Sequence, residues 1–218
     1  MKKSLYLDAQ NNEVKINTWK EALLPLQKNR SAPCLKQAAL IVIDMQNYFL
    51  DEKSHAFIPT GEAIVPNVQR LLTFFRDEGL PIVFTRFAVQ KGEPDPIRNW
   101  WGDSVSEGSK ESEVVEELKP QAQEKVLRKT SYDSFHGTDL EQYLKSHNVR
   151  DVIITGVLTN LCCEMAARES FTRGFSTFFA MDATATFNED LHLTSLINIA
   201  SGFATPLTTE EVLNHNAT

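Results

Sequence analysis

The sequence predicts an α/β protein of three layers, in which a mostly parallel sheet of about six strands lies between two layers of helices (a Rossmann-like arrangement). From residue 38 onward, short strand patterns alternate with helical patterns, which favours strand–helix–strand units. The strand segments are almost continuously apolar, as expected for strands that are buried on both faces. The chain has 218 residues, of which 42% are hydrophobic, and this is enough for one substantial core.

Residues 1–37 are predicted to form an N-terminal arm that precedes the main domain at 38–218. The segment 4–16 is expected to form a short hairpin, and the segment 18–27 a weak helical turn that Pro25 interrupts. We expect this arm to pack on the domain or on a neighbouring subunit.

Six apolar segments of the main domain are predicted to be strands: 38–44, 80–87, 124–129, 150–157, 175–183 and 203–207. Segments with helical spacing or helix-end signals are predicted to be helices: 64–79, 110–120, 137–148, 161–174, 188–202 and 208–215. Gly79 and Gly174 suit helix C-termini, and Pro120 stops a helix. Thr138 and Glu141 have the spacing of a capping box.

The overall charge and composition exclude several classes of function. The net charge of −7 and the lack of a basic cluster argue against nucleic acid and anionic lipid as partners. No apolar stretch is long enough to span a bilayer, and polar residues follow the N-terminal lysines too soon for a signal peptide. With three cysteines and no disulfide framework, we expect a cytoplasmic protein. Glycine-rich phosphate loops are missing from the sequence, so no nucleotide cofactor is expected.

In parallel sheets the active crevice lies beyond the carboxyl ends of the strands, so the polar residues there are the candidates for chemistry. They are Asp44, Arg86, Lys129 and the corner after Val157. A single carboxylate at a strand end is more often a cap, and a single lysine is more often solvated. The alternative is that Asp44 and Lys129 form a buried ion pair.

Two adjacent cysteines, Cys162 and Cys163, stand at a predicted strand-to-helix corner. The unpaired N–H groups at a helix start would lower the pKa of a thiol and make it a nucleophile. A buried cysteine is more commonly a small hydrophobic residue, and spacing alone does not decide which of the two faces the crevice. Together with Asp44 as base and Lys129 as electrostatic support, a thiolate here could attack a carbonyl carbon.

Three motifs resemble those of the isochorismatase-like hydrolase superfamily of cysteine hydrolases, and the resemblance extends from Ala38 to Leu213. They are "ALIVIDMQNYF", "KTSYDSF" and "GVLTNLCCEMAARESFTRGF" followed by "MDATA". The resemblance implies that Asp44, Lys129 and Cys162 are the catalytic residues. It also implies that Cys163 is a packing residue.

The same resemblance implies a cis peptide bond between Leu158 and Thr159. It would direct the N–H groups of Thr159 and Cys162 toward the oxyanion of a tetrahedral intermediate.

Two departures from subgroups of this family are expected to matter. Nicotinamidase members carry an Asp-x-His pair after the first strand and a further histidine after the second. Here Asp51 and His55 have a different spacing and "FTRFAV" contains no histidine, so we predict no metal and no other cofactor. True isochorismatases have glycine where Cys162 stands, glutamine where Phe87 stands and Tyr-Ala-His at 158–160.

Aromatic and cationic residues near the strand ends are predicted to bind the substrate. They are Phe49, Arg86, Trp101, Tyr132 and Phe135, with Trp100 as a further member of an aromatic wall. Arg86 would hold a substrate carboxylate. The long polar loop 88–110 is expected to be a lid or a subunit contact.

The leading hypothesis is a cysteine hydrolase that cleaves the C–N bond of a small amide, ureido or related compound through a thioester. One alternative is isochorismatase-type hydrolysis of a vinyl ether with Asp44 as general acid. The other is a non-catalytic binding or assembly module. We expect a small-molecule substrate and a homodimer or homotetramer.

Overall fold

The computed structural model describes residues 2–8, 10–26 and 32–214. Its centre is a sheet of six strands in the order β3-β2-β1-β4-β5-β6, and every neighbouring pair is parallel. The strands are β1 (Ala38–Ile43), β2 (Ile82–Phe87), β3 (Lys125–Lys129), β4 (Asp151–Val157), β5 (Ser176–Ala185) and β6 (Thr205–Leu207). The predicted fold class and all six predicted strands are confirmed.

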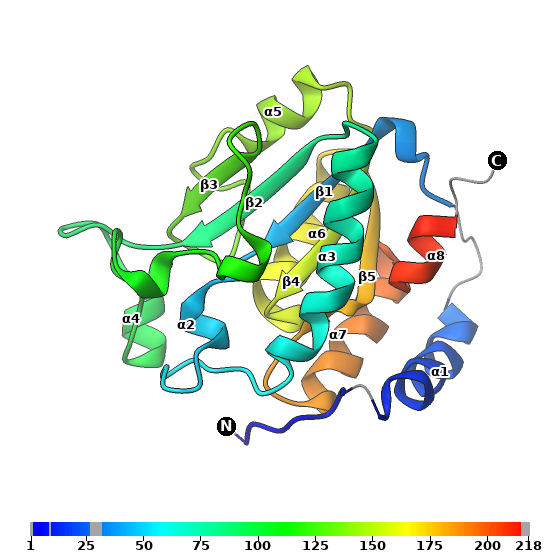
Figure 1. Cartoon of the computed structure of the whole chain (residues 1–218), viewed down its shortest axis with the longest axis horizontal. Coiled ribbons are helices and arrows are strands. Elements are labelled where there is room, and N and C mark those ends of the chain that lie inside the picture. Colours follow the sequence, from blue (N-terminus) through cyan, green and yellow to red (C-terminus); the bar gives the residue numbers. More distant parts are fainter. Residues whose placement is uncertain (1, 9, 27–31, 215–218) are drawn as a thin grey trace.

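Helices cover both faces of this sheet (Figure 1). Helix α3 (Gly61–Asp77) lies across one face with α8 (Thr209–Asn214) beside it, whereas α6 (Glu164–Thr172) and α7 (Glu189–Gly202) lie on the other. The remaining α-helices are α1 (Asn12–Leu23), α2 (Asn47–Leu50), α4 (Pro96–Trp101) and α5 (Leu140–Ser146). Residue 215, the last of the helix predicted at 208–215, lies outside the described residues.

The hairpin predicted at 4–16 is wrong. Residues 2–8 have no regular secondary structure, and α1 begins at Asn12 and ends at Leu23, two residues before the predicted break at Pro25. The Asp8 carboxylate accepts hydrogen bonds from the N–H groups of Gln10 and Asn11 at 2.8 and 2.9 Å. These bonds form an Asx turn that leads into a helix, so the polar residues of this stretch do not turn the chain back on itself.

The helix predicted at 110–120 is replaced by two short 3₁₀ turns, Lys110–Ser112 and Glu116–Leu118. Between them the backbone pairs with the chain that follows β1. Asn47 N–H donates to Glu113 O at 3.0 Å, and Val115 N–H donates to Met45 O at 2.9 Å. These bonds occupy backbone groups that a continuous helix would need.

The capping box predicted at the start of α5 is absent from the described contacts. The Leu140 N–H donates to Thr138 Oγ1 at 3.3 Å, but the Glu141 carboxylate accepts from Lys145 and Arg173 instead of the backbone. Lys145, one turn further along α5, and Arg173, which follows α6, occupy this carboxylate.

The described part of the N-terminal arm packs on the same chain, mainly against α7 (Figure 1). Trp19 and Leu23 of α1 are fully buried, and Tyr6 and Leu7 are nearly so. This contact extends the core beyond the sheet and its two helical layers. Within the described residues, no helix has the length and apolar character needed to cross a membrane.

Candidate active site

Three strand ends bring Asp44, Lys129 and Cys162 together. Asp44 follows β1, Lys129 is the last residue of β3, and Cys162 lies in the turn that follows β4. The Lys129 Nζ reaches across the end of the intervening β2 and lies 2.7 Å from Asp44 Oδ2 and 3.3 Å from Cys162 Sγ. The three residues are at most 3% exposed, so they interact in a space with little water.

Asp44 is fixed by the neighbouring strand β2. Its backbone has a positive φ of 49°, and its N–H donates to Thr85 O at 3.2 Å. The Thr85 hydroxyl donates to Asp44 Oδ1 at 2.7 Å. One carboxylate oxygen therefore accepts from Thr85, and the other faces Lys129.

Lys129 is a cation held between an anion and the thiol. Its Nζ also donates to Ser131 O at 2.9 Å, and the Phe87 ring lies 5.8 Å away. Burial opposes the charge on Lys129, but the Asp44 carboxylate and the Cys162 sulfur outweigh it, and the pKa of the ammonium is raised. Lys129 is therefore charged near neutral pH.

The turn that carries Cys162 begins at a cis peptide bond between Val157 and Leu158. The cis bond predicted between Leu158 and Thr159 is therefore wrong by one residue. It occurs where β4 ends, and Thr159 already lies in the π-helical turn Thr159–Cys163. The Leu158 carbonyl accepts hydrogen bonds from the N–H groups of Leu161 and Cys163, each at 3.1 Å.

The expectation that a helix start lowers the pKa of Cys162 is wrong. Burial raises the pKa of this thiol to about 12; Lys129 opposes the shift, whereas Asp44 adds to it. The turn before α6 does not compensate for the loss of water and the nearby carboxylate. The raised pKa favours the protonated thiol near neutral pH.

Cys163 has different surroundings from its neighbour. It is fully buried, and burial raises the pKa of its thiol well above the ordinary value. Only Cys162 of the two lines the cavity at the strand ends. The structure thus places one of the adjacent cysteines at the wall of a cavity and the other in the packed interior.

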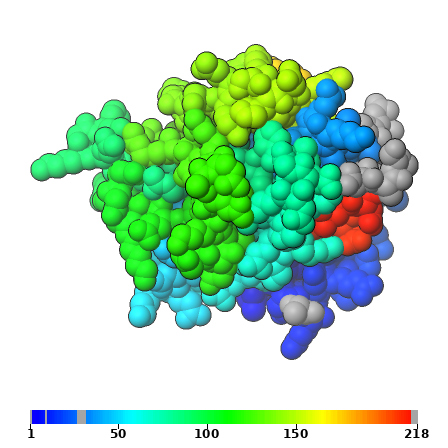
Figure 2. Space-filling model, turned by 45° about the horizontal axis from the view of Figure 1, so that its top comes forward, coloured from blue at the N-terminus to red at the C-terminus, as the bar shows by residue number. Residues whose placement is uncertain are grey.

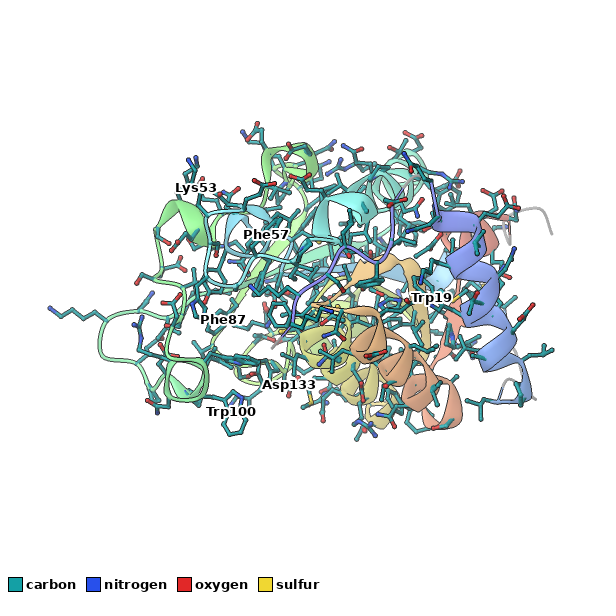
Figure 3. The ribbon with its side chains drawn as sticks, turned by 90° about the horizontal axis from the view of Figure 1, so that it is seen from below. Trp19, Lys53, Phe57, Phe87, Trp100 and Asp133 are labelled. Carbon is teal, nitrogen blue, oxygen red and sulfur yellow. The ribbon has the colours of Figure 1, made fainter. Side chains whose placement is uncertain are left out.

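The cavity beside Cys162 has a volume of about 260 Å³, close to the lower end of the range for small-molecule sites. Most of its wall is aromatic or aliphatic. Its lining residues are Lys3, Tyr48, Phe49, His55, Ala56, Phe87, Ile97, Trp101, Tyr132, Leu158, Leu161, Cys162 and Phe187. Figure 3 views the molecule from the side on which the strands end, with Phe87 among the side chains gathered there.

Three of the predicted substrate-binding residues, Phe49, Trp101 and Tyr132, line this cavity. Trp101 Nε1 donates to the Tyr132 hydroxyl at 2.7 Å, so the hydroxyl hydrogen is free to point elsewhere. Trp100, by contrast, is 79% exposed and points outward in Figure 3.

The other two predicted residues lie outside the lining. The Arg86 guanidinium donates to Glu107 Oε1 and to Ser112 O, each at 3.2 Å. Phe135 stacks on Phe175 with ring centroids 6.5 Å apart. The structure therefore gives Arg86 an internal anionic partner.

The loop at 88–110 contributes to the cavity through α4, which supplies Ile97 and Trp101. Another part of the loop, just after β2, projects at the left of Figure 1 and Figure 2.

Several lining residues were missed by the sequence analysis, notably Lys3, Tyr48, His55 and Phe187. Tyr48 and Phe187 stand near strand ends in the sequence, and that position was the available signal. Lys3 had no such signal, because it lies in the N-terminal arm and is not near the end of any predicted strand.

The residues at this site do not fit a zinc ion. Asp51 uses its carboxylate to accept from the Lys53 N–H at 2.9 Å, and His55 has no second histidine partner in the lining. Across the described ranges 2–8, 10–26 and 32–214, no group of three or more His, Cys, Asp or Glu side chains is arranged to hold a metal.

Comparison with known proteins gives consistent matches. Residues 38–211 match the model of the isochorismatase domain. Nicotinamidase 3 of Arabidopsis thaliana is 39% identical over 176 residues, which cover 79% of this chain and 85% of that protein.

Two solved structures show the same fold. A cysteine hydrolase from Pseudomonas syringae pv. phaseolicola 1448A superposes with a TM-score of 0.82 at 27% identity, covering 87% of this chain and 97% of the other. N-carbamoylsarcosine amidase from Thermoplasma acidophilum superposes with a TM-score of 0.72 at 26% identity, covering 80% and 97%.

Proposed function

This chain belongs to the isochorismatase family of hydrolases, and from that premise we propose that it cleaves the C–N bond of a small amide, ureido or related compound through a thioester on Cys162. The observation that carries the proposal is the contact of Lys129 with both Asp44 and Cys162 at the wall of a small cavity. The names of two similar proteins, a nicotinamidase and an N-carbamoylsarcosine amidase, support the choice of a C–N bond.

In the first half of the reaction, the Cys162 sulfur attacks the carbonyl carbon while its proton moves to Asp44. Backbone N–H groups of the 158–162 turn stabilise the oxyanion that forms, with Thr159 and Cys162 as the proposed donors. The C–N bond then breaks, and the leaving nitrogen takes the proton from Asp44. Ammonia or an amine departs, and the acyl group remains on sulfur.

In the second half, a water molecule attacks the thioester carbon and gives a proton to Asp44. The C–S bond breaks, the carboxylic or carbamic acid leaves, and the proton returns to the sulfur. Lys129 stays charged throughout and stabilises whichever of Asp44 and Cys162 carries the negative charge. Together the two halves add one water across one C–N bond.

The test is ammonia release from a panel of small primary amides and ureides, combined with intact-mass analysis of quenched enzyme. We expect turnover and a mass increase equal to the acyl group. Cys162→Ala should lose at least about 1,000-fold in kcat and all of the adduct, because the nucleophile is removed. Cys163→Ala is the matched control and should keep both.

Two outcomes would contradict the proposal. If Cys162→Ala retained full turnover of isochorismate, the reaction would be vinyl-ether hydrolysis with Asp44 as general acid. If neither amides nor isochorismate were turned over and no adduct formed, the fold would serve binding or assembly.

We further propose that the protein acts in the cytoplasm as a homodimer or homotetramer. Cys34, Cys162 and Cys163 are all free, which suits a reducing compartment. Trp100 is 79% exposed on α4, as is common for aromatic residues at subunit contacts. Sedimentation of the wild type and of Trp100→Ala tests the proposed oligomeric state, since a fully monomeric wild type would contradict it.

A further inference from the structure

The N-terminal segment 2–8 is fixed beside the cavity by hydrogen bonds to two distant loops. The Ser4 N–H donates to Phe187 O at 2.8 Å, in the loop after β5. The Thr60 hydroxyl accepts from the Tyr6 N–H at 3.2 Å and donates to Ser4 O at 3.3 Å, in the loop before α3. In Figure 1 this segment runs along the lower edge of the molecule toward α1. The hydrogen bonds to both loops therefore hold the segment 2–8 beside the cavity.

Lys3 is the residue of this segment that reaches the cavity. It lines the same cavity as Cys162. Its Nζ donates to His55 O at 2.8 Å and lies 4.9 Å from the centroid of the Phe187 ring. An ammonium has three N–H donors, so the bond to His55 leaves two of them for a ligand.

The charge of Lys3 is not matched by a nearby anion. Within the described part of the chain, Lys3 makes no ion pair, and no described lining residue is a carboxylate. Lys3 is an exposed residue, and its partial burial lowers its pKa. A ligand with a negative group at this position would therefore pair with an ammonium that has no other ion-pair partner.

We infer that Lys3 is a specificity-determining residue that binds a carboxylate of the substrate while the scissile amide or ureido group lies at Cys162. The inference rests on the proposed function for the group at Cys162. The small cavity and its aromatic wall define the rest of the ligand, which is a compact aryl or aliphatic body between the two ends. The substrate class is thus a small amide or ureide that also carries a carboxylate.

The test measures binding without turnover, using full-length protein with Cys162→Ser. The probes are 3- and 4-carbamoylbenzoate and their neutral near-isosteres 3- and 4-nitrobenzamide, titrated by calorimetry. We expect at least one carboxylate to bind more tightly than its nitro counterpart. Adding Lys3→Met should weaken that carboxylate at least about tenfold and change the nitro compound less than about twofold, because a charge-assisted hydrogen bond is lost.

Two further variants separate charge from structure. Lys3→Arg should keep most of the preference for the carboxylate. Lys2→Met is the matched control, because Lys2 is exposed, lies outside the lining and uses its carbonyl to accept from Asn188. This control should bind all four probes like the parent protein.

The inference is overturned if the carboxylates bind no more tightly than the nitro compounds. It is also overturned if Lys3→Met weakens both classes alike, since that result would indicate a purely structural role for Lys3. Failure of the proposed function has a separate signature: protein with Cys162 intact would form no acyl adduct with any amide, while the Lys3-dependent preference would persist.

Discussion

At the scale of single residues, the candidate active site combines one anion, one cation and one neutral thiol in a buried space. Asp44 and Lys129 balance each other at 2.7 Å, so ionising Cys162 in the resting state would add an uncompensated negative charge. Transfer of the thiol proton to Asp44 leaves the total charge unchanged. The raised pKa of the thiol therefore follows from its burial and from the nearby Asp44 carboxylate.

Replacing Lys129 with methionine should destabilise the protein by about 3–5 kcal/mol, because the Asp44 carboxylate then remains buried without a balancing cation. Adding Asp44→Asn to this variant should recover most of the loss, since no buried charge remains. Urea unfolding followed by circular dichroism measures both free energies of unfolding.

The matched control for Lys129→Met is Lys125→Met on the same strand. Lys125 pairs with Asp139 at 2.6 Å, but both side chains are partly exposed. This change should cost less than about 1 kcal/mol. Equal losses at the two lysines would mean that the buried pair contributes no more than a surface pair.

At the scale of elements, the strands were predictable and several connections were not. Apolar runs such as that of β1 are long enough to define buried strands by themselves. The segment 110–120 has helical composition, yet its backbone pairs with residues 45–47, which are far away in sequence. Such tertiary hydrogen bonds override local propensity, and sequence spacing does not reveal them.

One element junction depends on a single glycine. Gly156 in β4 has a φ of +110°, and a Cβ placed there would lie 2.1 Å from the carbonyl oxygen of Ile43 in β1. Ile43 and Gly156 are partners in the register of the two central strands. Strand β1 leads directly into Asp44, and β4 leads into the turn that carries Cys162. Close contact of these backbones sets how near Asp44 and Cys162 can lie.

Gly156→Ala should therefore cost more than about 4 kcal/mol or prevent soluble expression, because backbone atoms would have to separate. Gly174→Ala is the control: its φ is +86°, but no atom lies within 4 Å of the added methyl group. That change should cost only about 1–2 kcal/mol of backbone strain. Soluble yield and urea unfolding give the comparison, and similar losses at both glycines would show that the clash with β1 is relieved at little cost.

At the scale of the whole molecule, the site combines residues from both ends of the sequence. Position at the strand ends was enough to find Asp44, Lys129 and the cysteine pair, because parallel strands bring their carboxyl ends to one edge. The contribution of the N-terminal arm could not be found in this way. It depends on hydrogen bonds from residues 2–8 to the loops at Thr60 and Phe187, which are far away in sequence and which no local pattern reveals.

His192 of α7 connects the arm to the turn Thr159–Cys163, and we expect it to make the stability of the molecule dependent on pH. Its ring packs against those of Tyr6 and Trp19, and its Nδ1 is 2.9 Å from Thr159 Oγ1. Burial lowers its pKa from 6.5 to about 3, so only the unfolded chain takes up its proton between these values. Stability should consequently fall as the pH is lowered from 6.5 toward 3, with His192 contributing about 2–3 kcal/mol of the loss by pH 4.5.

Urea unfolding at pH 7 and 4.5 should show a smaller loss in His192→Asn and the wild-type loss in His147→Asn, whose side chain is exposed. An unchanged loss in His192→Asn would mean that acid acts elsewhere in the fold.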